Sequence, residues 1–230
     1  MILAGGLGTR ISEETADKPK PMVLIGGKPI IWHVMSIYAL QGYKDFLIAG
    51  GYKSDAIKDW VSSITEDWCV RVVDTGLATQ TAGRIKKCLK LVEGNKFFLT
   101  YGDGLGNVNL SDLVDANTRN NSIATVTAVR PPARFGSLDL SGEIVQHFGE
   151  KSQLSEGWIN GGFFLLSREI EGFLGSDEQI FESEVLPRLS RRGDLSALRH
   201  YGFWKPMDTL REKQELEILA KEDEVPWLRI

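Results

Sequence analysis

Short apolar runs alternate with segments of helical periodicity through the first 130 residues, and this alternation limits the folds open to the chain. Strands are expected at residues 1–4, 45–49, 69–73, 97–101 and 123–129. Between them, residues 28–41, 54–64 and 81–92 repeat apolar side chains three and four positions apart, which is typical of helices with one buried face. A further helix is expected from Ser111. This order predicts an α/β fold with a mostly parallel sheet covered by helices on both faces.

The second half of the chain has a different pattern. Residues 136–140 and 144–148 flank a Ser-Gly turn and predict a β-hairpin. Residues 158–166 predict a long strand interrupted by Gly161-Gly162, which indicates either a bulge or a close approach by a ligand or another backbone. Helices are expected at 181–192 and from Asp208 to about 221, with a strand at 195–200 between them. We expect one domain, residues 1–230, with both halves sharing one continuous sheet.

Composition excludes several classes of protein. The chain has 230 residues and a net charge of −4, which disfavours a general binder of nucleic acid or of anionic membranes. Its two cysteines form no CxxC pair and only three histidines accompany them, so neither a zinc site nor a disulfide framework is expected. Cysteine usage favours a reducing cytoplasm. No signal peptide and no apolar run of about 18 residues is present, so we expect a cytoplasmic protein outside the membrane.

A glycine-rich loop follows the first apolar run. Residues 3–10 read LAGGLGTR, and residues 18–21 read KPKP. Glycines let backbone N–H groups approach a phosphate closely, and Arg10, Lys18 and Lys20 could supply the cations that a triphosphate needs. The alternative is a tight strand-to-helix turn with no ligand. The loop fits neither a P-loop, because Gly27-Lys28 is followed by proline, nor a dinucleotide fingerprint, because position 11 is isoleucine.

Two aspartates are candidate metal ligands. Asp103 follows the strand expected at residues 97–101, and Asp208 follows the sequence WKPM. Magnesium bound to a triphosphate prefers one or two carboxylates, with water and phosphate oxygens completing its shell. The alternatives are a turn residue for Asp103 and the N-cap of the last helix for Asp208. Ligands bind at the carboxyl ends of parallel strands, so the glycine loop and Asp103 are expected to lie together.

The motifs LAGGLGTR and KPKP resemble the signature of the sugar-phosphate nucleotidylyltransferases. Members of that family join a nucleoside triphosphate to a sugar 1-phosphate and release pyrophosphate. The resemblance implies a Rossmann-like three-layer α/β/α sandwich with a mixed central sheet and a small β-hairpin region. It also implies a nucleotide-binding half, residues 1–130, and a sugar-phosphate-binding half, residues 131–230.

Further segments narrow the resemblance to the glucose-1-phosphate cytidylyltransferases. These segments are VDTG at 73–76, GR at 83–84, TYGD at 100–103, RFG at 134–136, NGGFF at 160–164, FW at 203–204 and PMDT at 206–209. The resemblance implies that CTP and α-D-glucose 1-phosphate give CDP-glucose and pyrophosphate, with Mg2+ assisting in-line attack on the α-phosphate. It also implies a place in nucleotide-sugar or polysaccharide biosynthesis.

The resemblance assigns roles by matching motifs. It implies that Arg10 and Lys20 are catalytic and that Asp103 and Asp208 hold Mg2+. The implied nucleotide-binding residues are Leu3, Ala4, Gly5, Gly6, Gly8, Thr9, Arg10, Thr75, Gly76, Arg84 and Gly102. The implied sugar-phosphate-binding residues are Gly136, Glu150, Lys151, Asn160, Gly161 and Trp204.

Other readings stay open at this point. The same reaction could use UTP or dTTP, or another phosphorylated acceptor. A non-catalytic nucleotide-sugar-binding module is a different class, although it would be free to lose the charged set Arg10, Lys20, Asp103 and Asp208. A nicotinamide dehydrogenase is disfavoured by the missing third glycine. About ten residues connect Ile64 to Asp74, fewer than the family usually has, and a homo-oligomer is expected.

Overall fold

A seven-stranded sheet forms the centre of the molecule. The computed structural model describes residues 1–131, 137–149 and 157–230. Strand order across the sheet is β12-β8-β11-β6-β1-β4-β5. The bounds are β1 (Ile2–Ala4), β4 (Asp45–Gly50), β5 (Cys69–Asp74), β6 (Lys96–Tyr101), β8 (Ala124–Val129), β11 (Ile159–Ser167) and β12 (Leu195–Arg199). Only β11 runs antiparallel, between β6 and β8, so the predicted mixed and mostly parallel sheet shared by both halves is confirmed.

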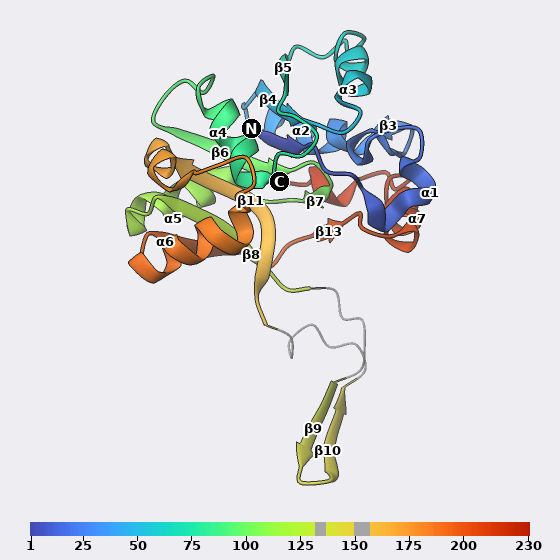
Figure 1. Ribbon diagram of the computed structural model, residues 1–230. Helices are drawn as coiled ribbons and strands as arrows, with labels where there is room; N and C mark the ends of the chain where they lie inside the picture. Colours follow the sequence, from blue (N-terminus) through green and yellow to red (C-terminus); the bar gives the residue numbers. More distant parts are fainter. Residues whose placement is uncertain (132–136, 150–156) are drawn as a thin grey trace.

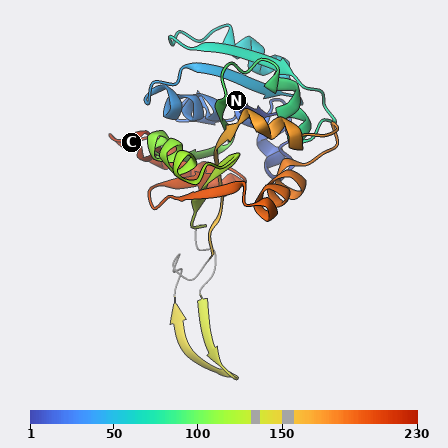
Figure 2. The ribbon, with the colours of Figure 1, turned by 90° about the vertical axis from the view of Figure 1, so that its left-hand side faces the viewer.

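Helices cover both faces of this sheet (Figures 1 and 2). Alternate strand residues point to opposite faces, so Ile2 and Leu3 of β1 belong to different hydrophobic cores. One core includes α2 (Ile30–Ala39), α3 (Ser54–Val61) and α7 (Leu210–Leu219), and the other includes α4 (Thr81–Leu89) and α6 (Leu186–Arg192). In addition, α5 (Leu110–Asn120) packs on β8 and β12, and α1 (Ser12–Thr15) is short. The predicted three-layer sandwich is therefore confirmed.

Three small antiparallel ladders lie outside the central sheet. Strand β2 (Leu24–Ile25) pairs with β3 (Lys28–Pro29), and β9 (Ser137–Ser141) pairs with β10 (Ile144–Gly149). The second pair confirms the predicted hairpin, with Gly142 at a positive φ in its turn. The third ladder pairs β7 (Gly104–Gly106) with β13 (Trp204–Pro206), and the Met207 N–H extends it by donating to the Asp103 carbonyl at 2.9 Å. This ladder places Asp208 beside Asp103.

The ends of several helices differ from the prediction. The last helix is capped by Thr209, whose hydroxyl accepts the Glu212 N–H while the Glu212 carboxylate accepts the Thr209 N–H, so Asp208 is not its N-cap. Asn109, and not Ser111, caps α5. The helix expected at 181–192 begins with a π-helical segment, η5 (Phe181–Val185), before α6. In the part of the chain that is described, no helix has the length and apolar character needed to span a membrane.

Candidate active site

A large pocket lies at the carboxyl ends of β1 and β6. Its volume is about 1400 Å³, and it is bounded by the glycine loop, the start of α4, the first residues of β11 and the β7–β13 ladder. Fifteen of the residues expected to bind substrate or metal line it: Leu3, Ala4, Gly5, Gly6, Gly8, Thr9, Arg10, Lys20, Arg84, Gly102, Asp103, Asn160, Gly161, Trp204 and Asp208. Thr75 and Gly76 do not line the pocket. Gly136, Glu150 and Lys151 lie outside the described residues.

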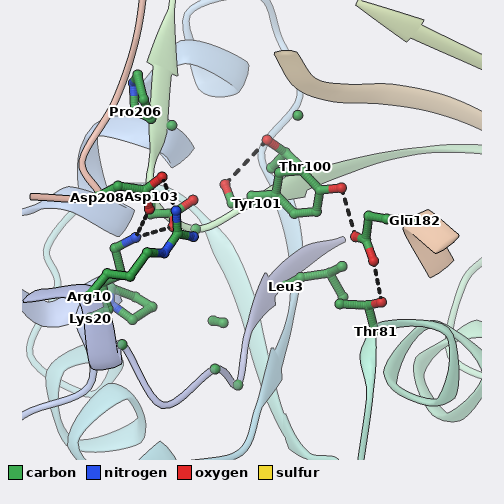
Figure 3. A pocket seen from close by; sticks show the side chains of 18 of the residues that line it. Leu3, Arg10, Lys20, Thr81, Thr100, Tyr101, Asp103, Glu182, Pro206 and Asp208 are labelled. Atoms are coloured by element: carbon green, nitrogen blue, oxygen red, sulfur yellow. Dashed lines mark hydrogen bonds and ion pairs between the residues drawn. The ribbon is translucent and has the colours of Figure 1, made fainter. Parts of the chain in front are cut away.

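Opposite charges converge on one wall of this pocket. The Lys20 Nζ lies 2.5 Å from Asp103 Oδ2 and 2.7 Å from Asp208 Oδ1, and Arg10 Nη1 donates to Asp208 Oδ2 at 2.7 Å (Figure 3). Burial lowers the pKa of Lys20, but the charge and hydrogen bond of Asp103, and then those of Asp208, outweigh it and raise this pKa above its usual value. Lys20 therefore stays a cation at neutral pH. Lys18, the other lysine of the KPKP motif, is 4.0 Å from Glu14 and does not line the pocket.

Arg84 holds together the ends of three strands. This buried guanidinium donates to the Gly5 carbonyl at 3.0 Å, to the Gly50 carbonyl at 2.9 Å and to the Thr75 hydroxyl at 2.5 Å. A side chain at Gly5 would collide with the guanidinium, which explains why the loop needs glycine there. Thr75 is 1% exposed, so its contribution to the pocket passes through Arg84. Burial lowers the pKa of Arg84.

The glycine pair in β11 is explained by packing. The pairing of β11 with β8 shifts register between Asn160 and Phe164, which is the bulge that one of the two sequence readings allowed. A side chain at Gly161 would meet Val129, and Gly162 has a φ of +81° and lies against the ring of Tyr101. The Gly161 carbonyl accepts the Trp204 indole N–H at 2.7 Å, which joins β11 to β13.

Sequence reasoning missed a second polar wall of the pocket. Tyr101, Thr81 and Glu182 all line it, and their hydroxyl and carboxylate groups are hydrogen-bonded to one another (Figure 3). Tyr101 directly precedes Gly102-Asp103 in the TYGD motif, so the motif could have identified it as a pocket residue. Nothing in the sequence marks Glu182 as a pocket residue, because a glutamate near the start of an amphipathic helix usually faces solvent.

The two aspartates are chemically suited to a hard divalent cation. Their carboxylate oxygens face the pocket, and their charge already attracts two cationic side chains, Lys20 and Arg10. In the described ranges no cluster of three or more His, Cys, Asp or Glu side chains could hold a metal. Two carboxylates alone fit the magnesium–triphosphate case, in which phosphate and water oxygens supply the remaining ligands.

Comparison with known proteins gives consistent matches. A model of the nucleotidyl transferase family matches residues 1–208. The chain is 43% identical over 250 residues to the glucose-1-phosphate cytidylyltransferase of Salmonella typhi, covering 99% of this chain and 97% of the relative. It is 38% identical over 249 residues to the probable glucose-1-phosphate cytidylyltransferase of Bacillus subtilis, covering 99% and 98%. Both matched stretches exceed 230 residues, so each relative carries residues that this chain lacks.

A solved structure extends the likeness to three dimensions. HddC from Yersinia pseudotuberculosis, complexed with GMP-PN, has a TM-score of 0.78 and 28% sequence identity. The match covers 96% of this chain and 98% of that chain.

Proposed function

Because the chain belongs to the nucleotidyl transferase family, we propose that it transfers the cytidylyl group of CTP to α-D-glucose 1-phosphate, giving CDP-glucose and pyrophosphate. The convergence of Lys20, Asp103 and Asp208 beside the glycine loop is the observation that carries the transfer chemistry. The choice of base and acceptor is supported by the two relatives named as cytidylyltransferases, which match almost the whole chain.

The reaction depends on positioning the two substrates and cancelling their charge, and it does not need a general base to remove a proton. A phosphate monoester has a second pKa near 6, so the sugar phosphate is mostly a dianion at neutral pH and already a nucleophile. One of its oxygens forms a bond to the α-phosphorus of CTP, the bond from that phosphorus to the β-phosphate oxygen breaks, and pyrophosphate leaves. Arg10 and Lys20 bind the triphosphate, with Lys20 nearest the α-phosphate, where charge develops in the transition state.

Asp103 and Asp208 would hold Mg2+. When bound, the ion neutralises phosphate charge and screens the repulsion between the two polyanionic substrates. Lys20 pairs with both carboxylates from a side chain that is only 10% exposed, and Arg10 pairs with Asp208 as well. The proposed triphosphate-binding cations therefore contact the proposed metal ligands directly.

The remaining roles follow from position in the pocket. Backbone groups of residues 3–9 and Gly102 would hold the base and phosphates, and Arg84, supported by Thr75, would fix the loop. Gly76 stays a predicted nucleotide residue outside the pocket lining. Asn160, Gly161 and Trp204 would line the sugar side. We keep the division into a nucleotide half, 1–130, and a sugar-phosphate half, 131–230, together with the predicted homo-oligomer and cytoplasmic location.

The decisive experiment is pyrophosphate release with Mg2+ and glucose 1-phosphate, with CTP, UTP, dTTP, ATP and GTP offered in turn. Release with CTP alone supports the proposal, and a chelator should abolish it. Release with another triphosphate would support the nucleotidyl transfer and would correct the proposed nucleotide base. Absence of release with all five, followed by absence with a panel of other phosphorylated acceptors, would support a non-catalytic binding module.

A further inference from the structure

Glu182 lies at the centre of a hydrogen-bond chain on the pocket wall. Its Oε1 accepts the Tyr101 hydroxyl at 2.7 Å, and its Oε2 accepts the Thr81 hydroxyl at 2.6 Å. The Thr81 oxygen in turn accepts the Phe181 N–H at 2.8 Å, and the Tyr101 oxygen accepts the Asn160 amide at 3.1 Å. Three elements, α4, β6 and η5, therefore fix one carboxylate in one orientation (Figure 3).

This carboxylate retains free hydrogen-bonding capacity. Each carboxylate oxygen can accept about two hydrogen bonds, and in the described part of the chain each oxygen of Glu182 accepts one. Burial, and then the charge of Glu182, raise the pKa of Tyr101, so its hydroxyl stays a donor to the carboxylate. Because Glu182 lines the pocket, its carboxylate belongs to a wall that a bound ligand would contact.

The charge of Glu182 limits what that ligand can be. None of the cations in the described residues forms an ion pair with it, whereas Lys20 and Arg10 are paired with Asp103 and Asp208. An unpaired anion repels phosphate, so the phosphates belong on the Lys20 side. Two adjacent acceptor atoms held rigidly suit two neighbouring hydroxyl groups, each donating to one oxygen.

Two substrates could supply such a diol, the ribose of the nucleotide and the ring of the sugar phosphate. The neighbours of Glu182 favour the sugar. The Tyr101 hydroxyl accepts the amide of Asn160, which precedes Gly161 in β11, and the Gly161 carbonyl accepts the Trp204 indole N–H. These are residues expected to bind the sugar phosphate. We propose that Glu182, oriented by Tyr101 and Thr81, binds two neighbouring ring hydroxyls of the sugar 1-phosphate and so selects the sugar. This inference rests on the proposed function, because it names the sugar contact of the same site.

The test compares Glu182→Gln with Glu184→Gln. Glu184 is a matched control because it lies in the same π-helical segment, is exposed, and uses one oxygen to accept the Ile180 N–H at 2.8 Å, which glutamine can also do. A hydrogen bond to a charged group is worth enough that Glu182→Gln should lower kcat/KM for glucose 1-phosphate by about 10- to 100-fold. KM for CTP should change by less than about twofold. Glu184→Gln should leave both values unchanged.

Deoxygenated substrates separate recognition from a merely structural role. The wild-type enzyme should discriminate against the 2-, 3- or 4-deoxy glucose 1-phosphate that lacks a hydroxyl bound by Glu182, and Glu182→Gln should lose that discrimination. An unchanged pattern of discrimination in Glu182→Gln would overturn the proposal. Glu182→Gln could instead lose the discrimination between CTP and 2′,3′-dideoxy-CTP while keeping that between glucose 1-phosphate and its deoxy analogues. In that case the diol is the ribose, and the sugar assignment is wrong.

Direct binding keeps this inference separate from the proposed function. Calorimetry with glucose 1-phosphate, in the presence of α,β-methylene CTP, should show weaker binding to Glu182→Gln than to wild type or Glu184→Gln. If the wild-type protein binds glucose 1-phosphate but releases no pyrophosphate, the proposed function is contradicted. The binding comparison with Glu182→Gln still tests the role of Glu182. Equal binding to all three proteins would overturn the assignment of Glu182.

Discussion

The Lys20 ammonium lies 2.5 Å from the Asp103 carboxylate, although 83 residues separate the two in the chain. The same ammonium contacts Asp208, so one cation contacts two carboxylates from distant parts of the sequence. Since the proposed reaction brings a metal and a triphosphate to this wall, each of the three side chains should be required for turnover.

Neutralising either carboxylate should abolish most activity. We expect Asp103→Asn and Asp208→Asn each to lower kcat at least about 100-fold, because an amide is a poorer ligand than a carboxylate for Mg2+. Pyrophosphate release measures the effect. Asp67→Asn is the control, because Asp67 pairs with Lys44 and does not line the pocket. Near-normal turnover in an aspartate variant would remove that residue from the metal site.

Removing the Lys20 charge should slow transfer without unfolding the protein. We expect Lys20→Met to lower kcat by about 100-fold or more, the loss typical of a group that stabilises developing charge. Lys18→Met is the matched control, because Lys18 belongs to the same motif but does not line the pocket. Equal rates for the two variants would show that the motif acts through its backbone and not through the Lys20 ammonium.

A methyl group on the glycine loop should have unequal consequences at two adjacent positions. At Gly5 it would displace the Arg84 guanidinium, whereas at Gly6 no atom lies within 4 Å. Because displaced hydrogen bonds at a buried cation are costly, Gly5→Ala should lower the free energy of unfolding by about 1–3 kcal/mol, and Gly6→Ala by much less. Chemical denaturation of both variants measures the difference. Equal stability would show that Arg84 relaxes without loss.

His33 should make the fold sensitive to mild acid. Its Nε2 contacts the Ile25 carbonyl at 2.8 Å, and its Nδ1 is 3.3 Å from the Trp227 indole N–H. An indole N–H can only donate, so the ring is neutral, with the proton on Nε2 donated to Ile25. Burial lowers the pKa of His33 below 6.5 despite the opposing backbone hydrogen bond.

The direction of the pH effect follows from that lowered pKa. Below about pH 6.5 the unfolded chain binds a proton at His33 that the folded chain does not, so the free energy of unfolding falls as the pH falls. Above pH 6.5 the contribution is constant. Denaturation between pH 5 and 7.5 should show a shallower slope for His33→Gln, and an NMR titration of the ring gives its pKa directly. A ring pKa above 6.5 would contradict the prediction.

The sheet could be predicted because its strands and helices alternate along the chain with clear periodicity. The position of β11 between β6 and β8 could not, because its pairing joins residues far apart in sequence. The π-helical start at Phe181 was also invisible, since apolar spacing does not separate an α-helical turn from a π-helical one. Thr209, and not Asp208, is the N-cap of α7, because its hydroxyl and the Glu212 side chain form a reciprocal pair of hydrogen bonds.

Much of the site was predicted from motifs, and the rest depends on tertiary contacts. Arg10, Lys20, Asp103 and Asp208 converge as the motifs implied. Thr75 was expected in the pocket but lies beneath Arg84, a relationship that its sequence neighbours do not reveal. Glu182 reaches the pocket because Tyr101 and Thr81 hold it there, and neither contact has a local signature.

The pairing of β7 with β13 has a consequence for protein synthesis. The glycine loop, Lys20 and Asp103 are all translated before Asp208, which follows in a much later part of the sequence. A nascent polypeptide therefore carries one of the two acidic residues while the second is still missing. Chains halted before β13 would lack that carboxylate, so the pair of aspartates beside Lys20 is completed only after β13 has been made.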